Sequence, residues 1–245
     1  MRKYMKKEFI PKLKEPLEKK IEDSLKLIKA QLEKHRYGSF VACSFGKDSM
    51  TVLYMVRKFK PDIPVFFANT LVQHPDVYKF RDKILKKWKI KNYVESKPVK
   101  TFWEVLKEKG LDDKKKHKNA CCYYLKERPS ILAIREYGFT CQFDGITVPE
   151  SRHRMLTICR YGVVQYHKRF NIIKVHPLAF WTPENVWDYI KQEGIPYCPI
   201  YDKGFDRSGC ITCTSWMYWR KQMQKHYPQL YKRIMEEGFG QKVLI

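Results

Sequence analysis

Apolar residues near the start of the chain recur with a helical period. Five of them are spaced four or three residues apart, namely Leu17, Ile21, Leu25, Ile28 and Leu32. This spacing places them on one face of a helix and the intervening Lys and Glu residues on the other. The pattern predicts an amphipathic helix over residues 15–36 that packs its apolar stripe into a core.

Short apolar runs then alternate with helical segments. The strand expected at 40–43 is followed by a tight turn at 44–49 and a helix over 50–59. Further strands are expected at 63–68, 93–95, 139–147 and 171–175, and further helices at 75–89, 101–109, 121–137 and 182–192. This alternation predicts an α/β fold, with a mostly parallel twisted sheet and helices on both faces.

The last of these helices has clear boundary signals. Thr182 can cap the helix, Pro183 fits its first position, and Glu184 suits the positive end of the helix dipole. Gly194 and Pro196 then end the helix.

Basic residues far outnumber acidic ones. The chain has 49 Lys and Arg against 26 Asp and Glu, a formal net charge of +23. This balance favours an anionic partner, such as nucleic acid or a phosphorylated substrate. The alternative is a Lys-rich surface of the thermophilic type, but such surfaces usually carry Glu in proportion.

Nothing in the sequence points to export or to a membrane. Residues 1–11 are charged and lack the apolar core of a secretory signal. No stretch approaches the roughly 18 apolar residues that could span a bilayer. We therefore expect a cytoplasmic protein without a membrane partner, in which clustered cysteines more often bind metal or do chemistry than form disulfides.

The turn at 44–49 has phosphate-binding features. It reads Ser-Phe-Gly-Lys-Asp-Ser, with small residues and backbone amides at the start of a helix. These amides and the helix dipole favour an anion, and Lys47 adds a full positive charge. It is not a Walker loop, because Val41 occupies a position where that pattern requires Gly. An ordinary capped turn is the alternative.

Four of the eight cysteines form two close pairs. Cys121 and Cys122 are adjacent, and Cys210 and Cys213 are separated by two residues. A vicinal pair is unusual for zinc, whereas four thiolates suit a [4Fe-4S] cluster. The alternative is that Cys121 and Cys122 are small core residues, which two neighbours on a helix cannot both easily be.

The 44–49 turn resembles the PP-loop of the ATP pyrophosphatase superfamily, whose pattern is Ser-Gly-Gly-x-Asp-Ser. Phe45 departs from the second position. Within the superfamily, Ser-Phe-Gly is typical of the APS and PAPS (sulfonucleotide) reductases, which usually lose the Lys-Asp-Ser that follows. The resemblance implies the adenine nucleotide alpha-hydrolase-like fold. The retained Lys47, Asp48 and Ser49 imply bound pyrophosphate, and hence ATP rather than a sulfonucleotide.

Further motifs of the PAPS/APS reductase-like family follow in the same order over about residues 38–215. Its nucleotide-side segment is matched by Asn69, Thr70 and His74. The first half of its cluster site is matched by Cys121, Cys122, Lys126 and Pro129, and the Lys of this motif lies near cluster and substrate. Its anion-binding segment is matched by Gly145, Ile146, Glu150, Ser151 and Arg154, with Thr147 in place of the first Arg.

One essential reductase feature is missing. The family's nucleophilic cysteine lies in a C-terminal Glu-Cys-Gly-Leu-His segment, but this sequence has no cysteine after Cys213. Cys43 and Cys141 fall in expected buried strands and are interpreted as structural. Cys159, in an expected exposed basic segment, and Cys198 could carry sulfur as a persulfide or attack an intermediate.

Two regions add to the basic character. Residues 203–233 interleave basic residues with aromatic ones, which suits a nucleic-acid strand as well as a packed helix with solvated lysines. The basic run at 114–118 is interpreted as a flexible lid over an anionic substrate.

The leading hypothesis is an iron-sulfur ATP pyrophosphatase that activates nucleic acid for sulfur insertion, with DNA phosphorothioation favoured over tRNA thiolation. ATP would adenylate the substrate, Mg²⁺ would be bound near the loop, and a cysteine desulfurase or another donor would deliver sulfur. The alternative is a sulfonucleotide reductase that uses Cys159, Cys198 or a partner thiol. A third possibility is a catalytically silent cluster protein that binds nucleic acid.

These hypotheses define the expected sites and segments. The expected catalytic residues are Lys47, Asp48, Ser49, Lys126 and Arg154. The nucleotide-binding set is Ser44, Phe45, Gly46, Lys47, Asp48, Ser49, Asn69, Thr70, His74, Gly145, Glu150 and Ser151, and the metal ligands are Cys121, Cys122, Cys210 and Cys213. The expected segments are a basic N-terminal helix (1–36), the PP-loop domain (37–200) and a cluster-completing, basic and aromatic C-terminal segment (201–245).

Overall fold

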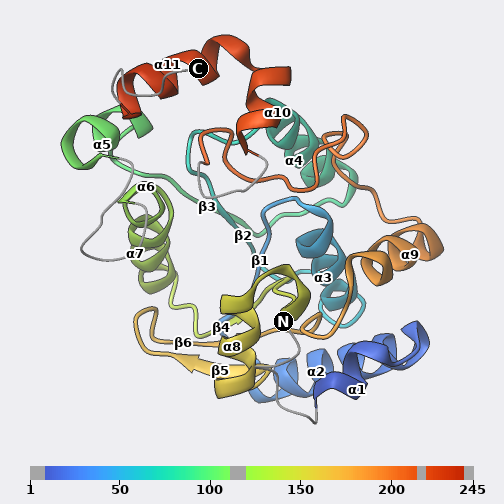
Figure 1. The fold of residues 1–245 in the computed structure, drawn as a ribbon. Coiled ribbons are helices and arrows are strands. Elements are labelled where there is room, and N and C mark those ends of the chain that lie inside the picture. Colours follow the sequence, from blue (N-terminus) through green and yellow to red (C-terminus); the bar gives the residue numbers. More distant parts are fainter. Residues whose placement is uncertain (1–8, 111–119, 214–218, 240–245) are drawn as a thin grey trace.

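Six strands form one sheet in the part of the chain that this computed structural model describes, residues 9–110, 120–213 and 219–239 (Figure 1). In the order of their pairing they are β3 (Tyr93–Ser96), β2 (Val65–Ala68), β1 (Ser39–Ala42), β4 (Cys141–Phe143), β6 (Ile172–Val175) and β5 (Val164–His167). All neighbouring strands are parallel except β5 and β6, which form an antiparallel hairpin.

The described helices lie before, between and after these strands in the chain. They are α1 (Phe9–Lys14), α2 (Leu17–Lys34), α3 (Lys47–Arg57), α4 (Pro75–Lys87), α5 (Phe102–Lys109), α6 (Ala120–Cys122), the π-helix η2 (Tyr123–Glu127), α7 (Arg128–Glu136), the 3-10 turn η3 (Val148–Glu150), α8 (Arg152–Tyr161), α9 (Pro183–Glu193), α10 (Trp219–His226) and α11 (Pro228–Phe239).

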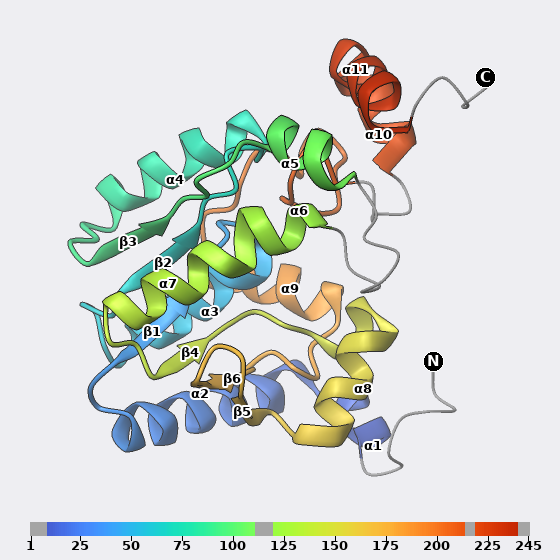
Figure 2. The ribbon, with the colours of Figure 1, turned by 90° about the vertical axis from the view of Figure 1, so that its left-hand side faces the viewer.

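The apolar strands bury both faces of the sheet. Successive side chains on a strand point to opposite faces, so Val41 and Phe67 join a core with α2, α3, α4 and α9. Their neighbours Phe40 and Phe66 join a second core under α7. Figure 2 shows α7 in front of the strands, with α3 behind them. Because both faces of the sheet are buried, the side chains along each strand are apolar at successive positions, and the strands are continuous apolar runs in the sequence.

The last two helices belong to a separate small core. Met223 of α10 and Ile234 of α11 pack with Phe102 of α5 and Leu125 of η2. Arg233 also places its guanidinium 3.9 Å from the centre of the Trp103 ring. Figures 1 and 2 show α10 and α11 near α5, away from the β5–β6 hairpin.

Helix boundaries follow the chemistry of their first residues. Thr182 accepts a hydrogen bond from the Asn185 amide while Asn185 caps Thr182 in return, and Gly194 ends α9 in the left-handed conformation. The boundary predicted for this helix is therefore confirmed. Thr101 and Glu104 form the same reciprocal cap at the start of α5.

The predicted α/β class, with a mostly parallel sheet, is confirmed. The structure differs from the predicted elements in several places. The helix expected over 121–137 contains the π-helix η2, and the strand expected over 139–147 spans only Cys141–Phe143. The strand β5 and the helix α8 were not predicted. The division into three segments stays a prediction, although Ile28 of α2 lies in the main core. Among the described helices, none is both long and apolar enough to cross a membrane.

We expect Ile28→Ala to lower the free energy of unfolding by about 2–5 kcal/mol, because it leaves a cavity under the sheet. Ile28 is fully buried, whereas its neighbour Lys29 is exposed. Chemical denaturation of Ile28→Ala and of the control Lys29→Ala tests this. Equal stability of the two variants would show that α2 is not part of the core.

Candidate functional site

The turn after β1 has an unusual backbone that presents the start of α3. Phe45 adopts a left-handed conformation, with φ of 59°, and its fully buried ring lies 5.4 Å from that of Phe67. Gly46 then caps α3, which begins at Lys47. The helix dipole and the first amides of α3 favour an anion at this point.

Hydrogen bonds within the turn fix its shape. Ser49 Oγ donates to the Gly46 carbonyl at 3.0 Å and lies 3.2 Å from Ser44 Oγ. Lys47 Nζ lies 2.7 Å from Asp48 Oδ1. The expected nucleotide-binding residues of this turn are therefore together, but Ser49, Lys47 and Asp48 have partners within the turn.

Two residues absent from the expected site close over the turn. The Lys47 amide donates to the Tyr201 hydroxyl at 2.9 Å. A methyl group added to Gly46 would collide with Ser208 Oγ and lie 3.1 Å from the same hydroxyl. Burial raises the pKa of Tyr201 strongly, so this hydroxyl stays protonated. In the sequence, Tyr201 and Ser208 lie shortly before the second cysteine pair, and this position is the signal that could have identified them.

The loop after β4 packs directly against this turn. A Cβ atom on Gly145 would lie 2.7 Å from the backbone carbon of Asp48, so only glycine fits here. Before it, Asp144 lies 2.6 Å from His176 Nδ1 and accepts a 2.8 Å hydrogen bond from Gln142. Burial alone raises the pKa of Asp144, but the interactions with His176 outweigh it and lower the pKa.

Arg154 lies beside both loops. Ser151 caps α8 by accepting a hydrogen bond from the Arg154 amide at 3.2 Å, and the Arg154 guanidinium pairs with Glu150. Burial lowers the pKa of this guanidinium, while the carboxylates of Asp144 and Asp48 favour its charge. The predicted anion-binding segment thus comes together at the carboxyl end of β4.

The segment after β2 is held by its own polar side chains. Asn69 Nδ2 donates to Glu95 Oε1 at 2.6 Å, and Asn69 Oδ1 accepts from the Leu71 amide and the Tyr78 hydroxyl, each at 2.8 Å. His74 caps α4 and bonds to the Tyr227 hydroxyl through its other nitrogen. These contacts shape the segment, and its role in nucleotide binding stays a prediction.

The two cysteine pairs lie at the same end of the sheet. Gln73 bridges to Cys210, and Thr70 Oγ1 lies 3.2 Å from Cys210 Sγ. A hydrogen bond from Cys121 and the charge of Lys126 lower the pKa of Cys122, outweighing its burial. Burial raises the pKa of Cys210, and Lys126 opposes that change. Lys126 is therefore close to both pairs.

The other four cysteines are buried. Burial raises the pKa of Cys43, Cys141 and Cys198 to about 11 in each case. Cys159, on α8, packs with Val148 and Ala179 and has 7% of its surface exposed. The expectation of an exposed Cys159 was wrong, because Met155 and Ile158 place it on the inner face of α8.

Some expected features fall outside the described residues. These are the basic run at 114–118, residues 1–8 of the N-terminal segment, and the aromatic positions Trp216 and Tyr218. Within the described part, Lys47, Arg154 and Arg207 are grouped near the 44–49 turn, and Lys126 lies towards the cysteines. This arrangement suits an anion with more than one charged group, held between the turn and the thiols.

The comparisons with known proteins agree with this arrangement. Residues 38–216 match the model of the phosphoadenosine phosphosulfate reductase domain. An adenosine 5'-phosphosulfate reductase from Oceanobacillus iheyensis is 32% identical over 181 residues, 73% of each chain. One from Staphylococcus epidermidis is 30% identical over 174 residues, 71% of this chain and 69% of that protein.

A solved structure shows the same fold. The phosphoadenylyl-sulfate reductase of Candida auris, in a phosphate complex, superposes with a TM-score of 0.61 at 22% identity. The alignment covers 77% of this chain and 88% of that one. The predicted superfamily and the adenine nucleotide alpha-hydrolase-like fold are confirmed.

These comparisons overturn the leading functional hypothesis. Relatives that match over most of their length are named adenosine 5'-phosphosulfate reductases, which contradicts ATP-dependent sulfur insertion into nucleic acid and ATP as the nucleotide. The retained Lys47, Asp48 and Ser49 also make hydrogen bonds that hold the turn in shape, so their presence does not by itself indicate ATP rather than a sulfonucleotide.

The cofactor predictions are also contradicted. Among the described residues, no group of three or more His, Cys, Asp or Glu side chains could hold a metal ion. Together with the names of the relatives, this contradicts the expected [4Fe-4S] cluster on Cys121, Cys122, Cys210 and Cys213, and the expected Mg²⁺. Proximity of the cysteine pairs was foreseen, but their spacing alone did not specify a metal. The nucleic-acid and desulfurase partners stay predictions.

We expect Gly145→Ala to destabilise the protein by about 1–3 kcal/mol and to weaken phosphate binding, because the methyl group pushes the two loops apart. Gly209→Ala is a matched control, since its methyl would meet only the flexible Arg207 side chain, at 3.3 Å. Thermal unfolding and phosphate titration measure both effects. Wild-type behaviour of Gly145→Ala would disprove the close contact.

We expect Asp144→Asn to lower the free energy of unfolding at pH 7 by about 3–5 kcal/mol, because it leaves buried partners unpaired. The folded-state pKa of Asp144 is lowered, so its contribution is present above the ordinary value of 3.8 and is lost as the pH falls through the folded-state pKa. The difference from wild type should therefore shrink below pH 3.8. Chemical denaturation at several pH values tests this, with the exposed Asp188→Asn as control. A difference in the free energy of unfolding between wild type and Asp144→Asn that stays constant with pH would contradict the prediction.

Proposed function

The chain belongs to the phosphoadenosine phosphosulfate reductase domain family, and from this we propose that it is a sulfonucleotide reductase whose substrate is adenosine 5'-phosphosulfate. The choice of this sulfonucleotide is supported by the names of relatives at 30% and 32% identity. The structural observation that carries the proposal is the contact of the loops after β1 and β4, with Arg154 beside them.

The proposed reaction is a two-electron reduction at sulfur. A thiolate attacks the sulfur of the substrate, the S–O bond to the phosphate breaks, and AMP leaves with the bonding electron pair. The product is a thiol-bound sulfonate, S–SO₃⁻. A second thiolate then attacks the first thiol sulfur, so that sulfite leaves and a disulfide remains. A dithiol is therefore oxidised for each substrate reduced, and its two protons are released.

Each expected catalytic residue has a role in this proposal. The start of α3 and Lys47 would bind the 5'-phosphate, while Asp48 and Ser49 hold the turn in shape. Arg154 would neutralise charge shared between phosphate and sulfate. Lys126, near the thiols, would stabilise the sulfonate as the S–O bond breaks.

The proposed source of the attacking thiol is a separate dithiol reductant. Cys43, Cys141 and Cys198 are buried, and their raised pKa values disfavour the thiolate. Cys159 is buried on the inner face of α8. An external thiol requires none of these four groups to reach the substrate. Cys122, which is exposed and has a lowered pKa, is the alternative source within the described residues.

Purified protein supplied with a dithiol should release sulfite from adenosine 5'-phosphosulfate, but not pyrophosphate from ATP. We expect Arg154→Ala to lower the rate about 10- to 100-fold, because a charged hydrogen-bond donor is lost. Arg160→Ala on the same helix is the control, since Arg160 is exposed. Sulfite assays on all three proteins measure this. The proposed function would be disproved if the protein released no sulfite from adenosine 5'-phosphosulfate and none from phosphoadenosine phosphosulfate.

The source of the attacking thiol is tested separately, by measuring the intact mass of the protein. Protein incubated with substrate but without reductant should remain free of covalent sulfonate, as measured by intact mass. A sulfonate on any cysteine of the chain would place the attacking thiol within this protein instead.

A further inference from the structure

Arg169, in the turn between β5 and β6, contacts both ends of the π-helix that follows the cysteine pair. We propose that it is a positioning residue, which holds this π-helix in the geometry that directs Lys126 towards the thiols. The inference rests on the proposed reductase function and names a residue that the described site does not include.

The π-helix η2 has a local cause in the sequence. Pro129 has no amide hydrogen, and its ring clashes with the carbonyl four residues earlier, that of Leu125. The neighbouring Arg128 amide instead bonds to the Tyr123 carbonyl five residues back, which is the π-helical pattern. The extra residue in this turn rotates the preceding residues, including Cys121 and Cys122, by roughly 100° about the helix axis compared with a regular α-helix continued from α7. The orientation of Cys121 and Cys122 therefore depends on this turn.

Two neighbouring side chains of the π-helix lie in different surroundings, one in the core and the other towards the candidate site. Leu125 is buried in the small core with α5 and α11. The next residue, Lys126, is exposed, and its charge acts on Cys122, Cys210 and Lys174. A regular α-helix would rotate Leu125 and Lys126 relative to these partners. The function proposed for Lys126 thus requires η2 to persist.

One guanidinium spans this segment. Arg169 Nη1 lies 2.5 Å from Glu127 Oε2, at the last residue of η2. The same guanidinium lies 4.8 Å from the centre of the Tyr123 ring, at the first residue. An ion pair and a cation–π contact each contribute only modestly to stability where solvent reaches them. Here one rigid guanidinium makes both contacts. Arg169 therefore fixes the two ends of η2 relative to each other.

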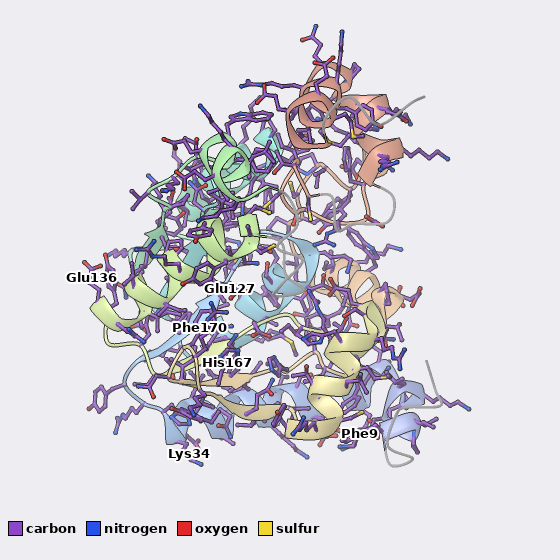
Figure 3. The ribbon with its side chains drawn as sticks, turned by 60° about the vertical axis from the view of Figure 1, so that its left-hand side comes forward. Phe9, Lys34, Glu127, Glu136, His167 and Phe170 are labelled. Atoms are coloured by element: carbon purple, nitrogen blue, oxygen red, sulfur yellow. The ribbon has the colours of Figure 1, made fainter. Side chains whose placement is uncertain are left out.

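The turn that carries Arg169 is itself anchored. The Phe170 amide donates to the His167 carbonyl at 3.1 Å, and Lys174 Nζ lies 4.5 Å from the centre of the Phe170 ring. Figure 3 shows Glu127 above Phe170 and His167 of this hairpin. The hairpin thus provides a fixed support from which Arg169 reaches the π-helix.

Arg169 also neutralises Glu127. The Glu127 carboxylate acts on the pKa of Cys122 and of Lys174, in both cases raising it. Without Arg169, this carboxylate is available to pair with Lys126 or Lys174 and to draw the Lys126 charge from the substrate. Removal of Arg169 should consequently impair the chemical step more than substrate binding.

The test compares Arg169→Ala, Arg169→Lys and the control Arg160→Ala. Arg160 also lies over a tyrosine ring, 5.2 Å from that of Tyr161, but on α8. We expect Arg169→Ala to lower kcat for sulfite release about 10-fold, as for other small displacements of reacting groups, with KM within about twofold. Arg169→Lys, which keeps the charge for Glu127, should recover part of kcat, and Arg160→Ala should match wild type.

Amide hydrogen exchange gives a readout that does not depend on activity. In Arg169→Ala, the amides of residues 123–128 should exchange about 10-fold faster than in wild type, while those of α3 stay unchanged. Unchanged exchange in 123–128, or equal loss of kcat in Arg160→Ala, would overturn the inference. If wild type released no sulfite but Arg169→Ala still accelerated this exchange, the reductase function would fail while the structural role of Arg169 stood.

Discussion

The site depends on the contact between two backbone segments, Gly145 and Asp48. β1 and β4 are parallel neighbours, so the loops that follow them leave the sheet at the same edge. The chain builds β2 and β3 on one side of β1 and then places β4 on the other, so the strand order reverses at this point, where α/β proteins commonly bind ligands. Gly145 allows the two loops to meet without a side chain between them. The 44–49 turn and Arg154 are adjacent for this reason.

Strain in the first loop is offset by burial. A left-handed residue other than glycine costs about 1–2 kcal/mol. Phe45 accepts this conformation while burying its whole ring in the main core, and a buried phenylalanine contributes about 1.5–3 kcal/mol. The two terms are of similar size, so packing can maintain a shape that glycine would adopt freely. The phenylalanine that interrupts the expected Gly-Gly pattern is thus part of the support for the turn.

Much of the fold was predictable because its signals are local. The helical period of α2, the apolar runs of β1 and β2, and the cap at Thr182 all act within a few residues. The strand β5 was missed because Val164, Gln165, Tyr166 and His167 lie on an edge and are only partly buried or exposed, so no apolar run marks them. The burial of Cys159 had a usable signal, since Met155 and Ile158 precede it at helical spacing.

The order of the motifs predicted that residues far apart in the chain would come together, but not what they do. Arg154 does lie near the 44–49 turn, and Cys121 and Cys122 lie near Cys210. Their roles in binding or catalysis stay predictions. The choice of ATP was wrong because a turn that favours an anion does not specify which phosphorylated nucleotide it meets. The names of the relatives correct that choice.

The same limit applies to the π-helix. Pro129 was visible as a motif residue, but its effect on Leu125 depends on a helix already being formed around it. A proline near the start of a helix is ordinarily harmless, because the first amides have no partners there. Here α6 and η2 precede Pro129, so the missing amide falls inside a continuous helical segment. The chain accommodates it by widening one turn, directly after Cys121 and Cys122. The irregular backbone at Phe45 and at η2 is thus held in each case by a residue distant in the chain, Phe67 for the first and Arg169 for the second.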